Sequence, residues 1–444
     1  MKRYISFFAC FFSALTLCSC LRDAYPTPTV PVEDTLQEES FAESVSMPPV
    51  TEADTVVTEY EEELPQEVIS WCCRNPDADR VIMTPEEIAK ENERILNASE
   101  SMTDIFAFPD TVSAEVLKSM ISRHALPGDN RYDSDGSEIQ NDHIDIVRQR
   151  MTVNEDGTLR VKLGIMTSRG NVRMVPDNKP YRKSPDNPYD SVQSTELSLG
   201  TPVLVLYTTY DFEYYFVLSC NYSGWVHTGE VAIAESRDEW LVFAQPNNLV
   251  CITDPLYRDG DLRLDMGATL PFTFANGVEY TIILPARNPD GTLSSTEYAL
   301  PHASACIGYL PYTYKNYLAQ AYKYEGTPYG WGGLDDGIDC SGLVLNVFRT
   351  FGFSFPRDTS QQDKIIGDSL YVAQNAEALS ADRLDTFVPT VVYYPGHTLL
   401  YIGRDDTDGK YYFIHAPQIG ECVTVTSKTS LAGLTYVCRI ERHE

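Results

Sequence analysis

Basic residues are scarce in this 444-residue chain. Lys and Arg together number 34 against 64 Asp and Glu, which gives a formal net charge of −30. Binding to phosphate groups depends on clustered Lys and Arg, so nucleic acid and anionic membrane surfaces are poor electrostatic partners. The chain is too long for one hydrophobic core, and its 43% hydrophobic content is ordinary for folded material. We therefore expect several domains.

Long hydrophobic runs are missing after the first twenty residues. A positively charged start precedes the apolar run Ile5–Leu17, which is too short to span a bilayer and is typical of a signal peptide. Cys20 follows this run in a context that resembles the lipobox of bacterial lipoproteins. We expect a signal peptide over residues 1–19, a lipid on Cys20 as the only membrane anchor, and a place in the cell envelope, by resemblance the periplasmic face of the outer membrane. The alternative is an ordinary signal peptide with an incidental cysteine.

CxxC pairs are also missing among the 11 cysteines, so a zinc ribbon is not expected. Residues 20–70 contain few apolar side chains and are rich in Pro, Thr, Ser and Glu. Such a segment cannot form a packed core, and we expect a disordered tether behind the lipid. Residues 71–135 then show two helix starts, a capping box at Thr84–Glu87 and a cap at Ser113. We interpret them as a helical stabilising segment packed against the region that follows.

Short strand-like runs broken by Gly, Pro, Asn and Asp fill the middle of the chain. They divide into residues 136–235 and residues 236–303, which we interpret as two small all-β barrels. One larger β-sandwich has the same signature and is the alternative. Residues 304–444 change to an α+β pattern, with helices expected at Tyr314–Tyr324 and Ser341–Phe351.

One cysteine in this last region, Cys340, lies at the predicted start of a helix, where a nucleophilic thiolate is favoured. A glycine-rich stretch leads into Asp339-Cys340, and the apolar residues after Cys340 recur at helical spacing up to a C-cap at Gly352. Asp339 is a good N-cap, so Cys340 lies in the first turn of a helix. Unpaired N–H groups and the helix dipole favour a thiolate there, and we expect a lowered pKa and a nucleophilic sulfur.

Two histidines on neighbouring strand-like runs supply a base and an orienting group. If the hairpin turns about Asp406, His397 lies opposite His415 and both rings project from one face. A slip of one residue would break this geometry. Singly, a buried cysteine or a strand histidine is ordinary. The three residue types also suit a zinc site with an open position, although a zinc ligand has no need of a helix N-terminus.

These three strings, GTPYGWGG–DCSG, GHTLLYIG and FIHAP, together resemble the NlpC/p60 family of cell-wall cysteine peptidases. The resemblance implies a papain-like domain at 304–444 that needs no cofactor and no metal, with Cys340 as nucleophile, His397 as base and His415 as the third polar residue. It also implies a carbonyl-polarising tyrosine at Tyr329, an aromatic wall at Trp331, and an amine-binding role for Asp339 and Ser341 in members that cleave after an N-terminal dipeptide.

The order of the upstream regions resembles family members with a helical segment and two SH3-like domains before the peptidase. In such members an SH3-like domain often blocks longer substrates, so they act on peptidoglycan stem peptides with a free L-Ala amine. They cleave the bond between γ-D-Glu and the diamino acid. The interval between Phe355 and Val391 departs from the family pattern and lacks an obvious GDLVFF-like strand. A wall-binding lipoprotein with an inactive peptidase domain is the alternative function.

Overall fold

The computed structural model describes residues 64–126, 128, 131–372, 384 and 387–442. The predicted signal peptide, Cys20 and most of the tether lie outside these residues. None of the described helices is long and apolar enough to cross a membrane.

The N-terminal helices divide between two hydrophobic cores. Helix α2 (Pro85–Ala98) starts with the predicted capping box, in which the Glu87 N–H donates to the Thr84 hydroxyl at 3.3 Å and the Thr84 N–H donates to the Glu87 carboxylate at 2.9 Å. The buried side chains of α1 (Gln66–Cys72) and α2 join the core of the C-terminal domain, as does β1 (Val81–Met83) by pairing with β18 (Tyr312–Thr313).

Only α3 (Ala114–Ser122) packs where the sequence predicted, against the first β region. The prediction is wrong for α2, because its apolar face is covered by a domain more than two hundred residues further along the chain. Helix α1 was not predicted, and it packs in the same core.

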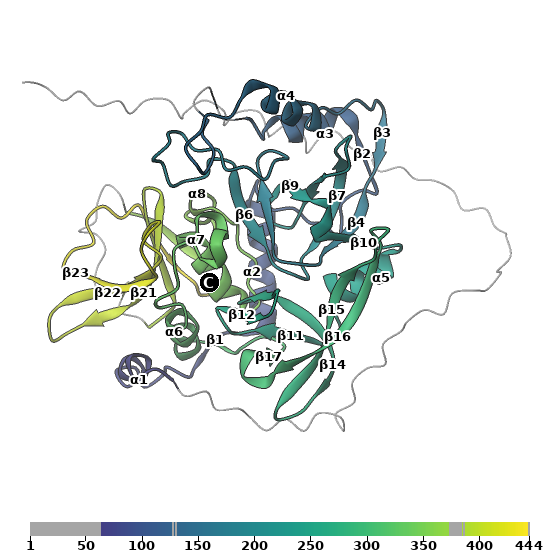
Figure 1. The fold of residues 1–444 in the computed structure, drawn as a ribbon. Helices are drawn as coiled ribbons and strands as arrows, with labels where there is room; N and C mark the ends of the chain where they lie inside the picture. Colours follow the sequence, from purple (N-terminus) through teal and green to yellow (C-terminus); the bar gives the residue numbers. More distant parts are fainter. Residues whose placement is uncertain (1–63, 127, 129–130, 373–383, 385–386, 443–444) are drawn as a thin grey trace, which may run out of the picture. The chain divides into compact units, whose positions relative to one another are not determined.

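The first β region forms a seven-stranded sheet in the order β10-β4-β7-β8-β9-β5-β6. Strands β4, β7, β9 and β10 of this sheet are labelled in Figure 1. The strands are β4 (Lys162–Met166), β5 (Gly170–Arg173), β6 (Gln193–Leu197), β7 (Pro202–Thr208), β8 (Tyr214–Leu218), β9 (Ser223–His227) and β10 (Val231–Ile233). Helix α4 (Asn141–Arg150) precedes them, and β2 (Thr111–Ser113) pairs with β3 (Thr158–Arg160).

The boundary expected at residue 235 lies too early. Helix α5 (Arg237–Ala244) places Trp240 in the core of the first β region, where the indole N–H donates to the Gly164 carbonyl at 3.0 Å. The indole is fully buried, so it needs this acceptor.

The second β region forms a separate sheet in the order β16-β15-β14-β11-β17, with its own core. Its strands are β11 (Leu249–Ile252), β14 (Thr269–Ala275), β15 (Glu279–Arg287), β16 (Leu293–Pro301) and β17 (Ala305–Ile307), beside the hairpin β12 (Leu256–Asp259) and β13 (Leu262–Asp265). In β11 and β17, Cys251 and Cys306 are directly opposite each other as free thiols.

The C-terminal domain packs helices on one face of an antiparallel sheet. The sheet order is β19-β24-β20-β21-β22-β23, and the bounds are β19 (Asp368–Tyr371), β20 (Thr390–Tyr394), β21 (His397–Asp405), β22 (Lys410–His415), β23 (Thr424–Lys428) and β24 (Tyr436–Arg439). The helices are α6 (Tyr314–Tyr322), α7 (Cys340–Arg349) and α8 (Thr359–Gln362), so both expected helices are confirmed. Within the interval from Phe355 to Val391, where the sequence lacked an obvious strand, the structure describes β19, which pairs with β24. Strand β20 begins at the end of this interval and pairs with β21.

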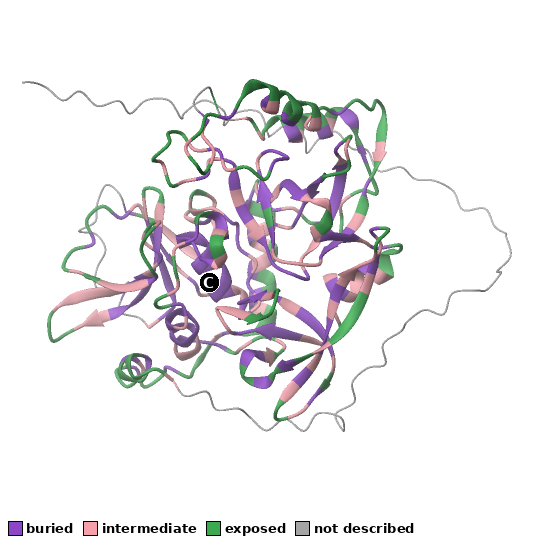
Figure 2. Cartoon of the chain, viewed as in Figure 1, coloured by how far each residue is buried: buried purple, intermediate pink, exposed green. Residues whose placement is uncertain are grey.

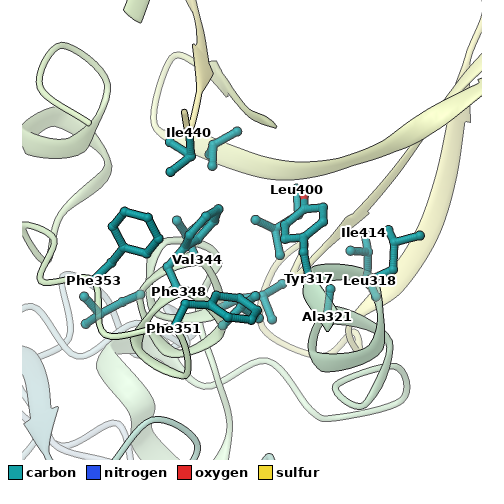
Figure 3. Packing of buried hydrophobic residues seen from close by; sticks show 14 of the residues in the cluster. Tyr317, Leu318, Ala321, Val344, Phe348, Phe351, Phe353, Leu400, Ile414 and Ile440 are labelled. Atoms are coloured by element: carbon teal, nitrogen blue, oxygen red, sulfur yellow. The ribbon is translucent and has the colours of Figure 1, made fainter. Parts of the chain in front are cut away.

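The core between helices and sheet fixes the start of α7. Figure 3 shows Val344 and Phe348 of α7 and Tyr317 of α6 with Leu400 and Ile414 of the sheet. Every residue from Cys340 to Phe348 is buried (Figure 2). A helix buried along this length cannot turn about its axis, and its first residue is therefore held in one place.

Candidate active site

Cys340 is the first residue of α7, as the sequence predicted, and its side chain is 8% exposed. Asp339 caps the helix by accepting from the Gly342 N–H at 2.8 Å. The Cys340 sulfur accepts from the N–H of Thr398, the residue after His397, and lies 3.8 Å from the Thr359 hydroxyl. The fold therefore brings the thiol to the start of the histidine strand.

The expected lowering of the Cys340 pKa is not what the site produces. Burial raises the pKa of this thiol, and the neighbouring Asp339 carboxylate raises it further. The N–H of Thr398, the Thr359 hydroxyl and the Arg357 charge act in the opposite direction and do not compensate. The sequence prediction failed because it counted the helix end and not the desolvation of a buried sulfur.

His397 and His415 meet as predicted, although by a different register. The Nε2 of His397 lies 2.8 Å from the Nδ1 of His415, and the ring centroids are 5.0 Å apart. The hairpin pairs Leu400 with Ile414, which places His415 level with residue 399 and not with His397. An offset of two residues keeps both rings on the same face.

A β-bulge makes this possible. Pairing runs from Asp405 with Lys410 to Gly403 with Tyr412, and then shifts so that Tyr401 pairs with Phe413. Without the shift, His415 would lie level with Leu400, whose side chain points to the opposite face. The bulge absorbs one residue and corrects the alternation.

The histidine pair is neutral over a wide pH range. Burial, and then the charge of Lys428, lower the pKa of His397. Burial, His397 and Lys428 together lower the pKa of His415 to about 4. The Lys428 ammonium lies 4.9 Å from the centre of the Tyr394 ring on the neighbouring part of the sheet.

Tyr329 and Trp331 lie on the stretch that leads into α7. Burial, followed by Asp339 and Cys340, raises the pKa of Tyr329, so its hydroxyl stays a hydrogen-bond donor. Trp331 is 39% exposed and packs edge-to-face on Tyr189 of the first β region, with centroids 5.3 Å apart. The indole is thus a surface contact between two parts of the chain and not a core residue.

Asp339 and Ser341 belong to a buried network around Arg357. The Arg357 guanidinium donates to both Asp339 oxygens at 3.0 and 2.6 Å and to the Ser341 hydroxyl at 2.9 Å. Asp339 also accepts from the Gly332 N–H at 3.0 Å. Although burial opposes it, Arg357 lowers the pKa of Asp339 and holds the carboxylate charged. The N-cap interpretation of Asp339 is confirmed, while its predicted amine-binding role stays a prediction.

Several residues of the site were missed by the sequence analysis. Arg357 is 3% exposed and also donates to the Thr195 hydroxyl of β6 at 2.7 Å. Gln193 of β6 donates to the Gly332 carbonyl at 3.0 Å. Arg357 and Thr359 fall in the interval that departs from the family pattern, and nothing in the sequence indicates that an arginine there is buried.

No three His, Cys, Asp or Glu side chains of the described chain are arranged to hold a metal ion. The zinc alternative needs Cys340, His397 and His415 around one ion, and it has no geometric support in this arrangement.

The C-terminal domain thus places a buried cysteine at the first turn of a helix, against a strand that begins with a histidine backed by a second histidine, and this arrangement is papain-like. Residues 326–438 match the NlpC/P60 family, and residues 178–227 match the SH3 domain of the SH3b1 type. The C-terminal domain therefore contains an NlpC/P60 domain, and the first β region contains an SH3 domain.

Comparison with individual proteins agrees with this assignment. The chain is 25% identical over 155 residues to the gamma-D-glutamyl-L-lysine dipeptidyl-peptidase of Bacillus cereus, and 29% identical over 128 residues to that of Bacillus subtilis. These matches cover 32% and 26% of this chain, and it spans only 44% and 36% of the length of those relatives.

The fold extends the likeness over most of the chain. A solved NlpC/P60 endopeptidase from Photobacterium damselae subsp. piscicida superimposes with a TM-score of 0.67 at 18% identity, covering 86% of this chain and 99% of that one. At this identity the likeness concerns the fold alone.

Proposed function

We propose that this chain is a cysteine peptidase that hydrolyses peptidoglycan stem peptides between γ-D-Glu and the diamino acid, in fragments with a free N-terminal L-Ala. The observation that carries the proposal is the placement of the Cys340 sulfur against the residue after His397, with His397 tied through Nε2 to His415. The names of the two Bacillus relatives support the choice of bond.

The proposed reaction is amide hydrolysis through a thioester. Because Nε2 of His397 is engaged with His415, Nδ1 is the nitrogen available to the thiol, and neutral His415 fixes that tautomer. Burial raises the pKa of the thiol and lowers that of the imidazole, so the resting pair is neutral. The proton then moves to His397 as sulfur attacks the carbonyl, and it passes to the amine that leaves as the C–N bond breaks. A water molecule, deprotonated by His397, then cleaves the thioester, and the proton returns to the sulfur of Cys340.

The developing oxyanion needs donors that are already in place. The N–H of Cys340 lies at the start of α7 and has no partner within the helix. Tyr329 supplies a hydroxyl that stays protonated because burial, Asp339 and Cys340 all raise its pKa. We propose that these two groups polarise the scissile carbonyl.

The free amine of the substrate requires a carboxylate near the nucleophile. Asp339 is already surrounded by the donors of Arg357, Gly332, Ser341 and Gly342. Asp358 is half-buried and directly precedes Thr359, which contacts the sulfur. We propose that Asp358 binds the amine of the substrate in addition to Asp339. Tyr189 of the first β region and Trp331, which pack on each other, would then bound the dipeptide.

The test uses the full-length chain on two synthetic peptides, L-Ala-γ-D-Glu-diaminopimelate with a free amine and the same peptide N-acylated. Wild type should cleave the free peptide, and Cys340→Ala should abolish cleavage. Asp358→Asn should raise KM for the free peptide, with Asp363→Asn as the control. Equal cleavage of both peptides by wild type would refute the amine requirement. Cleavage of neither, with wall binding unchanged in Cys340→Ala, would favour the wall-binding lipoprotein.

We further propose that the protein is exported and held by a lipid on Cys20, as the sequence predicts. Metabolic labelling with a palmitate analogue should mark the wild type and not Cys20→Ala. A label that persists in the variant would contradict this anchor.

A further inference from the structure

The stretch that leads to the nucleophile has an unusual backbone. In the turn Trp331–Asp336, four residues have φ in the left-handed region: Gly332 at 57°, Gly333 at 84°, Asp335 at 58° and Asp336 at 56°. Two of these are not glycine, and such residues need support from their surroundings to keep this conformation. The turn ends three residues before Asp339, the N-cap of the nucleophile helix.

Arg169 supplies support from outside the peptidase domain. It lies in the turn between β4 and β5 of the first β region, and its Nη1 donates to the Gly333 carbonyl at 2.8 Å. The same guanidinium bonds Asp265 of β13 at 2.8 Å and lies 3.4 Å from Glu196 of β6 and 3.9 Å from Asp336. With 10% of its side chain exposed, Arg169 joins groups from both β regions and the peptidase domain at one point.

The Trp331–Asp336 turn also lies in close contact with β6. Gln193 donates to the Gly332 carbonyl at 3.0 Å, and a Cβ on Gly332 would lie 3.0 Å from the Ser194 carbonyl oxygen. A Cβ on Gly333 would overlap the Glu196 side chain. From the second β region, Arg263 donates to Asp336 at 3.1 Å. Both β regions therefore contribute contacts that support the shape of this turn.

We propose that Arg169 is a positioning residue for the peptidase, because it holds the Trp331–Asp336 turn and so couples docking of both β regions to the placement of Trp331 and Cys340. The link to the nucleophile is the Gly332 N–H, which donates to the same Asp339 carboxylate that caps α7. Arg169 itself acts only through the turn. The test by kcat and KM rests on the proposed function, whereas the tests by Cys340 alkylation and Trp331 quenching do not.

The test compares Arg169→Lys and Arg169→Met with Arg150→Met in the full-length chain. Arg150 is a matched control, since it is a half-buried arginine of the same region that bonds Asp211 at 2.7 Å and does not reach the turn. Lysine keeps the charge but has no fork to bond Asp265 and Gly333 together. Asp336→Asn, which tolerates the left-handed backbone, tests the turn directly and serves if an Arg169 variant does not fold.

Three measurements are made on each variant. The first is kcat and KM for the stem peptide, and the second is the rate at which iodoacetamide alkylates Cys340, followed on the tryptic peptide that contains this residue. The third is the quenching of Trp331 fluorescence by iodide. Trp331 is the one exposed tryptophan, since Trp71, Trp225 and Trp240 are buried, and a Trp331→Phe chain gives the background.

We expect Arg169→Lys to lose about tenfold or more in kcat with a smaller change in KM, and to change the alkylation rate and the quenching at a melting temperature equal to that of the control. Asp336→Asn should move the same readouts in the same direction. Values within twofold of the control in all three measurements would overturn the proposal. A wild type without turnover would refute the proposed function, and alkylation and quenching would still decide the role of Arg169.

Discussion

Arg357 and Asp339 form a buried ion pair, with 3% and 6% of the residues exposed. Through this pair Arg357 holds the carboxylate that caps the nucleophile helix. The guanidinium fork satisfies both carboxylate oxygens and reaches Ser341 and Thr195 as well. Such a pair is weak evidence for net stability, yet breaking it leaves one buried charge without a partner.

Removing one member of this pair should therefore be costly. Arg357→Met is expected to lower the free energy of unfolding by about 3–5 kcal/mol, measured by urea denaturation. Arg148→Met removes an exposed arginine paired with Asp145, and it should cost less than about 1 kcal/mol. Equal effects of the two substitutions would contradict the assigned role of Arg357.

The acid limb of the pH–rate profile should report His397. Its pKa is lowered, so the neutral base persists below the ordinary pH range and kcat/KM falls only as pH drops through the lowered pKa. Lys428→Met removes a cation that disfavours the imidazolium, so the pKa should rise and the acid limb should move to higher pH by a few tenths of a unit. Lys410→Met, at the far end of the hairpin, is the control. A shift to lower pH would contradict this assignment.

At the scale of elements, the sequence predicted the features that depend on neighbouring residues, and it did not predict those that depend on distant contacts. The cap at Asp339, the helix after it and the two histidine strands follow from residues adjacent in the sequence. The raised pKa of Cys340, the burial of Arg357 and the bulge in β21 depend on partners far along the chain. Local preferences in a single sequence contain no information about these distant partners. A register shift of two residues could not be detected either, because it keeps the side chains on the same face.

The facing cysteines of β11 and β17 give a prediction at this scale. Cys251 and Cys306 are opposite residues of an antiparallel pair, and both are free thiols. Such residues have Cα atoms about 5.5 Å apart or less, within disulfide range. Oxidised glutathione should accept the two electrons and two protons of these thiols and leave a disulfide that stabilises the chain by about 2–4 kcal/mol.

Mass analysis of the non-reduced tryptic digest should find the two cysteine peptides linked. Cys251→Ala, treated in the same way, should gain no stability from the oxidant. Alkylation of both cysteines after oxidation of the wild type would contradict the prediction.

At the scale of the whole molecule, the peptidase domain is not a self-contained C-terminal unit. Its core includes Val68, Trp71, Ile88 and Ile95 from the N-terminal segment. Asn92 of α2 donates to the Gly352 carbonyl at 2.8 Å and accepts from the Ser354 N–H at 2.8 Å, immediately after α7. Helices α1 and α2 therefore belong to the peptidase fold, whereas α3 does not.

A single substitution in α2 should destabilise the distant site. Ile95→Ala, at a fully buried position, is expected to cost about 2–5 kcal/mol in urea unfolding, and Cys340 should become reactive to iodoacetamide in the same transition. Ile69→Ala, on the exposed side of α1, is the control and should cost well under 1 kcal/mol, in the range of surface changes. Separate transitions for α2 and for Cys340 would contradict a shared core.

The bulge in β21 also bears on how such chains are recognised. Because the odd residue is absorbed between Tyr401 and Gly403, the far end of the hairpin, Asp405–Lys410, lies beyond the part that orients the histidines. Insertions or deletions there alter the count of residues from His397 to His415 and leave the facing of the rings unchanged. A search pattern that fixes this spacing will pass over homologues whose hairpins differ in length, whereas one that scores each histidine with its own strand will find them.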